Sequence, residues 1–147
     1  MTNLTSLSQR LEQAEGADRE LDALIYAQAV AGEMIDAEGC LWARVRPRTA
    51  TMVMVKGQPK TVPSYVPAYT ASIDAAMSLV PREAFWRVGH DGEGPDPSLF
   101  RADVLHTNPA KPMPEARGHF CATAATPALA LASAAIRALA AQEQEHG

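Results

Sequence analysis

The chain has 147 residues, of which 47% are hydrophobic, 20% charged and 5% aromatic. This composition excludes a disordered chain and predicts one compact domain with an alanine-rich core. The formal net charge of −4 argues against a general nucleic-acid binder, since such proteins usually carry a basic domain. With only two cysteines, Cys40 and Cys121, a disulfide-rich scaffold is excluded as well.

The N-terminal third predicts helices. Apolar residues recur at helical spacing on both sides of Gly16, which indicates two helical pieces at residues 5–15 and 18–31. Asp18 can cap the second piece, because its carboxylate can accept from backbone N–H groups of the first turn. Gly32 is a plausible stop for that piece.

The hydrophobic period changes to two after residue 40. Residues 41–46 and 51–55 alternate or are rich in β-branched side chains, so we expect a β-hairpin over residues 40–56. Pro59, Pro63 and Pro67 then interrupt the chain, and we interpret this stretch as an extended connector because proline lacks a donor N–H.

The second half alternates between helix and strand signals. Ser72 can cap a short helix at residues 72–80, and the strand signals that follow lie at residues 85–88, 100–106 and 119–123. Thr126 and Pro127 begin a long Ala/Leu helix over residues 126–142, which we expect to be buried against a sheet or a partner chain.

This order of elements favours an α+β fold in a single domain. We expect a layered α/β/α sandwich, in which an antiparallel or mixed sheet is covered by helices. The longest apolar run, 124–141, is too polar for a membrane span, and the N-terminus lacks the pattern of a secretory signal. A cytoplasmic protein is therefore expected.

Three blocks of the sequence resemble the phage ABA sandwich domain, a family of small phage- and prophage-encoded proteins. The blocks are residues 67–81 (PAYTASIDAAMSLVP), 124–138 (AATPALALASAAIRA) and 11–22 (LEQAEGADRELD). The resemblance implies a sheet between two helical layers and a phage or prophage origin in a bacterial host. It supplies no catalytic residues, because the matching blocks look structural.

The predicted hairpin concentrates positive charge. No acidic residue lies between Glu38 and Asp74, whereas that window contains Arg44, Arg46, Arg48, Lys56 and Lys60. Alternation along a strand places Trp42 on the same face as Arg44 and Arg46. Guanidinium groups bind phosphate in a bidentate manner and an indole can stack on a base, so Trp42, Arg44, Arg46, Arg48 and Lys56 are the candidate ligand-binding residues. The alternative is a sheet edge kept soluble by its charges.

No metal or catalytic signature is present. His119 and Cys121 would share one face of a strand, but the four histidines and two cysteines lack the paired spacings of a zinc site. Nothing pairs a nucleophile with a base at a recognised spacing, so we expect neither a cofactor nor an enzyme.

Two functions remain from these observations. The first is a sponge that sequesters a small anionic nucleotide, such as a cyclic nucleotide or a cyclic ADP-ribose type of immune signal, to counter bacterial anti-phage defence. The second is a structural or regulatory interaction module, which would use residues 52–54 or the apolar helix 126–142 to bind a partner. We expect a homo-oligomer and no specific DNA or RNA. A nucleotide-cleaving enzyme is a third hypothesis, which the sequence disfavours because no constellation of residues specifies it.

Overall fold

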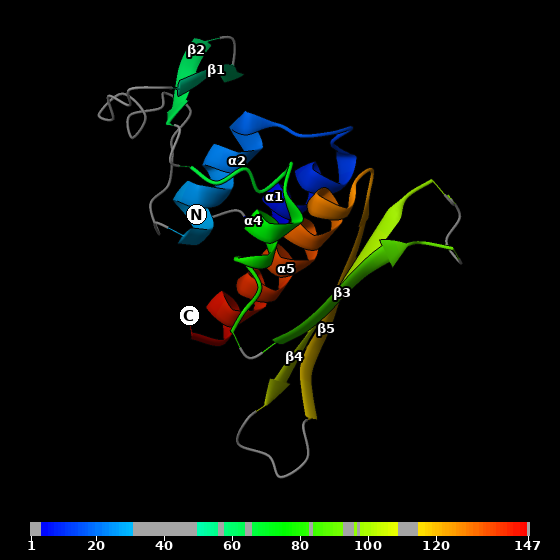
Figure 1. The fold of residues 1–147 in the computed structure, drawn as a ribbon. Helices are drawn as coiled ribbons and strands as arrows, with labels where there is room; N and C mark the ends of the chain where they lie inside the picture. Colours follow the sequence, from blue (N-terminus) through cyan, green and yellow to red (C-terminus); the bar gives the residue numbers. More distant parts are fainter. Residues whose placement is uncertain are drawn as a thin grey trace.

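A three-stranded antiparallel sheet lies against a group of helices in this computed structural model (Figure 1). The structure describes residues 4–30, 50–55, 58–63, 66–82, 84–92, 96, 98–108 and 115–146. The arrangement confirms the predicted α+β class and the antiparallel sheet. This arrangement also leaves one face of the main sheet without a covering helix among the described residues.

The N-terminal residues form the helices α1 (Leu4–Gln13) and α2 (Arg19–Ile25), and α2 continues into one π-helical segment, η1 (Tyr26–Val30). The predicted cap is confirmed, since the Asp18 carboxylate accepts from the backbone N–H groups of Glu20 and Leu21. The proposed stop at Gly32 lies outside the described residues.

A separate hairpin pairs β1 (Ala50–Val55) with β2 (Gln58–Pro63). The interpretation of the proline-containing stretch as a connector was wrong for β2. Each strand of this two-stranded sheet has a free edge among the described residues, and an edge position tolerates a proline that cannot donate a hydrogen bond. The predicted partner of residues 51–55, residues 41–46, lies outside the described residues.

A buried network ties α2 to the segment before α4 (Ile73–Met77). The Asp22 side chain, 1% exposed, accepts from the backbone N–H and the hydroxyl of Thr70, both at 2.8 Å, and from Arg19 Nη1 at 2.8 Å. The Thr70 hydroxyl also accepts from the Asp18 N–H at 2.8 Å. These bonds hold α2 against the segment that contains Thr70, and they satisfy a carboxylate whose ionised form burial would otherwise destabilise.

Helix α4 is shorter than the predicted 72–80. Ser72 caps it as predicted, by accepting from the Ala75 N–H. After Met77 the chain continues with bonds from Leu79 N–H to Ala76 and from Val80 N–H to Met77, which are turns of the tighter, three-residue kind. Such a turn leads directly into Pro81, before which an α-helical residue is disfavoured.

The main sheet has the order β3-β4-β5, with strands Ala84–His90, Phe100–Asn108 and Glu115–Ala124. The three predicted strands are confirmed and extend further than predicted. Thr126 then caps α5 (Pro127–His146) by accepting from the Leu129 N–H at 3.2 Å.

Helix α5 is the centre of the core. It contacts all three strands of the main sheet as well as α1 and α4, and its side chains from Ala128 to Ile136 are buried. The Ser133 hydroxyl donates to the Ser8 carbonyl of α1 at 2.9 Å, and Arg137 pairs with Glu12, which also belongs to α1. The long helix is thus buried against the sheet of its own chain, which was one of the two predicted outcomes.

The described helices lie on one side of the main sheet (Figure 1). The second helical layer that the resemblance implies is not formed by any helix in the described part of the chain. No described helix is long and apolar enough to cross a membrane. The face of the main sheet opposite α5 is therefore not covered by any helix among the described residues.

Candidate functional site

The two faces of the main sheet have different chemistry because side chains alternate along each strand. The face toward α5 takes buried Ala102, Val104, Ala122 and Ala124. The residues between them, with their counterparts on β3, lie on the opposite face, which we call the open face. Its described side chains are Phe85, Arg87, Arg101, Asp103, Leu105, His119, Cys121 and Thr123.

The strand register arranges the open face in rows. Phe85, Leu105 and His119 form one row across the sheet, because Phe85 pairs with Leu105 and Leu105 with His119. The next row begins with Arg87, which is opposite Asp103, and Asp103 is opposite Cys121. Asp103 is therefore the central residue of the face.

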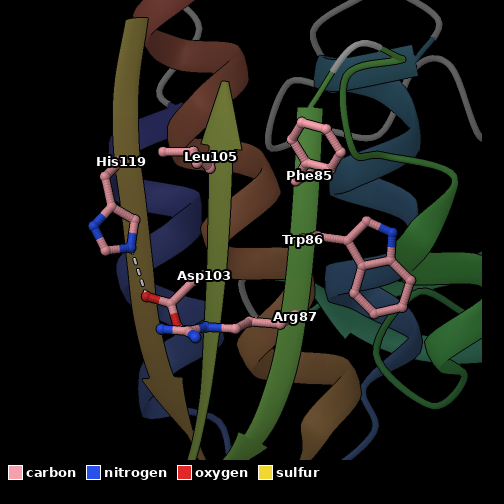
Figure 2. A pocket seen from close by; sticks show the side chains of 6 residues that line it. All are labelled: Phe85, Trp86, Arg87, Asp103, Leu105 and His119. Atoms are coloured by element: carbon pink, nitrogen blue, oxygen red, sulfur yellow. Dashed lines mark hydrogen bonds and ion pairs between the residues drawn. The ribbon is translucent and has the colours of Figure 1, made fainter. Parts of the chain in front are cut away.

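Asp103 is surrounded by nitrogen donors from three side chains. Its carboxylate accepts from Arg87 Nε at 3.3 Å, from Arg101 Nε and Nη2 at 3.3 and 3.1 Å, and contacts His119 Nε2 at 2.6 Å. Figure 2 shows Arg87 and His119 reaching this carboxylate from the two neighbouring strands. An ionised carboxylate can only accept, so Nε2 of His119 carries the proton in this contact.

These contacts govern the charge of Asp103. Its burial alone would raise the pKa of the carboxyl, but hydrogen bonds from His119, Arg101 and Arg87 outweigh burial and lower the pKa below its usual value of 3.8. The same pairing raises the pKa of the Arg101 guanidinium. Asp103 is consequently an anion at neutral pH that orients Arg87, Arg101 and His119.

Two depressions lie on the open face on either side of the Arg87–Asp103 pair. The first has a volume of about 410 Å³, and Phe85, Trp86, Leu105 and His119 complete its lining (Figure 2). The second has a volume of about 470 Å³, and its remaining lining residues are mainly polar or glycine: Val88, Gly89, His90, Asp91, Gly92 and Arg101. One depression is thus mainly apolar and the other mainly polar.

The open face offers little for metal binding or covalent chemistry. Among the described residues, no group of three His, Cys, Asp or Glu side chains is placed to hold a metal ion. His119 and Cys121 share a face, as their spacing predicts, and Cys121 is exposed and free. No hydrogen bond joins the two in the described part of the chain, so the thiol has no base beside it.

The residues predicted from sequence to bind a ligand are not among those that form the open face. Trp42, Arg44, Arg46, Arg48 and Lys56 all lie outside the described residues, so the basic hairpin stays a prediction. Sequence reasoning missed the Asp103 cluster. The available signal was the alternation of Arg101, Asp103 and Leu105 within a predicted strand, but its partners depend on a register that only the tertiary structure supplies.

No family model, curated protein or solved structure matches this chain.

Proposed function

We propose that the open face of the main sheet binds a small phosphorylated anion and that the protein acts by holding this ligand without changing it. The nucleotide signal of bacterial defence expected from the sequence is a ligand of this class. Sequestration of such a signal in the cytoplasm of a bacterial host is the role we propose for the binding.

The observation that carries the proposal is the ratio of cations to anions around Asp103. The guanidiniums of Arg87 and Arg101 share this one carboxylate with the imidazole of His119, and both guanidiniums stay charged at any physiological pH. The Arg87 side chain is 82% exposed and contacts Asp103 only through Nε, so its two terminal nitrogens are available to a ligand. Guanidinium groups held in place by a carboxylate are well suited to bind phosphate oxygens.

Binding without chemistry is supported by the state of the groups that could react. His119 uses Nε2 to contact Asp103, and no described serine, threonine or cysteine donates to the ring. The hydrogen bond fixes the orientation of the imidazole. It does not create the nucleophile and base pair that hydrolysis of a phosphate ester would require.

The proposal is tested by thermal unfolding with a ligand panel of pyrophosphate, ATP, NAD, cyclic dinucleotides and cyclic ADP-ribose isomers. A ligand at 100 times its Kd should stabilise the protein by about 2.7 kcal/mol, a shift of several degrees. Arg87→Ala and Arg101→Ala should remove the shift without unfolding the protein, because exposed ion pairs contribute little to stability. Ligand recovered intact after heating supports sequestration.

The matched control is Arg82→Ala, since Arg82 is exposed and lies in the turn before β3, outside the lining of both depressions. This variant should keep the full shift. Loss of the shift in an Arg44→Ala, Arg46→Ala double variant, with Arg87→Ala unaffected, would instead place the ligand on the basic hairpin. A panel that produces no shift contradicts the proposal.

The second candidate is a protein-interaction module, and it is favoured by one observation. Phe85 is 66% exposed and Leu105 37% exposed, and the two are neighbours on the open face. Exposed apolar neighbours are typical of interaction surfaces. The helix 126–142, the surface first expected for a partner, is largely buried against its own sheet, so the open face replaces it in this hypothesis. A Phe85→Asp variant that changes the oligomeric state in light scattering would support the module.

A further inference from the structure

The open face changes character along β3, and this order is informative about the ligand. Phe85, Arg87 and Gly89 lie on one line along the open face of β3. Asp91 continues this line two residues later, just after the strand ends, and lines the polar depression together with Arg87 and Gly89. The line begins with an aromatic ring, continues with a cation and a glycine, and ends with a carboxylate. It is about 20 Å long at the usual rise per residue of a strand, which exceeds the length of one nucleotide.

The first part of the line suits a flat ring. The Phe85 ring is 66% exposed and lies beside Leu105 at the mouth of the apolar depression, whereas Trp86 points away from Asp103 past the edge of β3 (Figure 2). A nucleobase can stack on an exposed ring irrespective of its identity, because every base has a π-face. This part would hold the base of a nucleotide.

The middle of the line suits phosphate. Arg87 lies between the two depressions, and Arg101 lines the polar one directly opposite Gly89. A Cβ atom added at Gly89 would meet nothing within 4 Å, so the backbone there is open to a ligand. A phosphate group in this position would lie beside both guanidiniums, because Gly89 places no side chain there.

The far end of the line excludes phosphate but suits hydroxyl groups. Asp91 is 8% exposed, lines the polar depression, and its backbone is fixed by a hydrogen bond from its N–H to the Leu99 carbonyl at 3.0 Å. No described side chain donates a hydrogen bond to its carboxylate, although its charge acts on the nearby Arg101 guanidinium. A carboxylate in that state repels phosphate but accepts hydrogen bonds from the hydroxyls of a sugar.

We propose that the ligand of the open face is a nucleoside diphosphate joined to a second sugar, with its base on Phe85, its phosphates at Arg87 and Arg101, and the second sugar at Asp91. This inference rests on the proposed anion-binding function and adds the order of the three parts. It predicts that each part contributes separately to affinity.

The test is titration calorimetry with a series of probes: pyrophosphate, ADP and ADP-ribose, repeated with UDP and UDP-glucose. Affinity should rise along each series. Phe85→Ala should weaken ADP by about fivefold or more and leave pyrophosphate unchanged, because only stacking is lost. Asp91→Ala should weaken ADP-ribose by about tenfold or more and leave ADP no weaker, because hydrogen bonds to a charged acceptor are lost.

The control for Phe85→Ala is Met77→Ala, another exposed apolar side chain, and the control for Asp91→Ala is Asp74→Ala, a carboxylate that is exposed. Both residues lie on α4 and outside the two depressions. Neither should change any Kd. If the sugar conjugates bind no tighter than the diphosphates, or if Asp91→Ala tightens ADP-ribose, the order of parts is wrong while anion binding stands. If neither pyrophosphate nor any nucleotide binds, the proposed function fails as well.

Discussion

Removal of the Thr70 hydroxyl should destabilise the protein strongly, because that one group serves both a buried carboxylate and a part-buried backbone N–H. In Thr70→Val, Asp22 loses one of its three short donors while its carboxylate remains 1% exposed. A hydrogen bond to a charged group contributes about 1.5–3 kcal/mol, and the lost acceptor for the Asp18 N–H adds about 0.5–1.5 kcal/mol. The expected loss is about 3 kcal/mol, which lowers the Tm of a chain of this length by about 6–12 °C.

Urea denaturation followed by circular dichroism measures this loss directly. The matched control is Thr123→Val, since Thr123 lies half-buried in a strand and makes no side-chain hydrogen bond in the described part of the chain. Its free energy of unfolding should stay within about 0.5 kcal/mol of the parent protein. A change of that small size in Thr70→Val would refute the reasoning, because it would mean that water replaces Thr70 as the donor to Asp22.

The other predictions concern the two ends of the pH range. The pKa of Asp103 is lowered in the folded protein, so its contribution to stability is complete above the unfolded value of 3.8 and is lost as the pH falls through the lower folded value. On acidification, Asp103→Asn should therefore lose less stability than the parent protein. Parallel losses in urea midpoint between about pH 5 and pH 2 for the two proteins would contradict this. Burial raises the pKa of Tyr69 to about 12, so the contribution of this tyrosine to stability is present below pH 10.0 and lost toward pH 12. Between neutral pH and pH 12, Tyr69→Phe should therefore lose less of its free energy of unfolding than the parent protein. Alkaline unfolding midpoints, read with tyrosinate absorbance, check that difference.

Local signals in the sequence were sufficient for most of the secondary structure. The caps at Asp18, Ser72 and Thr126 each depend on a side chain and the N–H groups two or three residues later, so no tertiary information is needed to predict them. The strands of the main sheet were also predicted from the residue types of each segment. The error at β2 arose because Pro59 was treated as a break, whereas a strand with a free edge accommodates it.

The candidate site was beyond the reach of the same reasoning. Arg87 and Asp103 are 16 positions apart, as are Asp103 and His119, and they meet only because of the register of β3, β4 and β5. A register shifted by one residue would place Asp103 on the face toward α5, among alanines. A sequence shows which residues are charged, but it does not show which charges become neighbours across strands.

Net charge is a poor guide to what such a face binds. The chain carries a formal charge of −4, which by itself would disfavour an anionic ligand. At physiological salt, however, charges more than about 8 Å away are largely screened, so a ligand at Arg87 is affected mainly by the neighbouring groups. Those are Arg101, His119 and the carboxylates of Asp103 and Asp91, of which Asp103 already accepts hydrogen bonds from both guanidiniums. The proposed binding of an anion therefore depends on how the strand register presents the guanidiniums of Arg87 and Arg101, and not on the net charge of the whole chain.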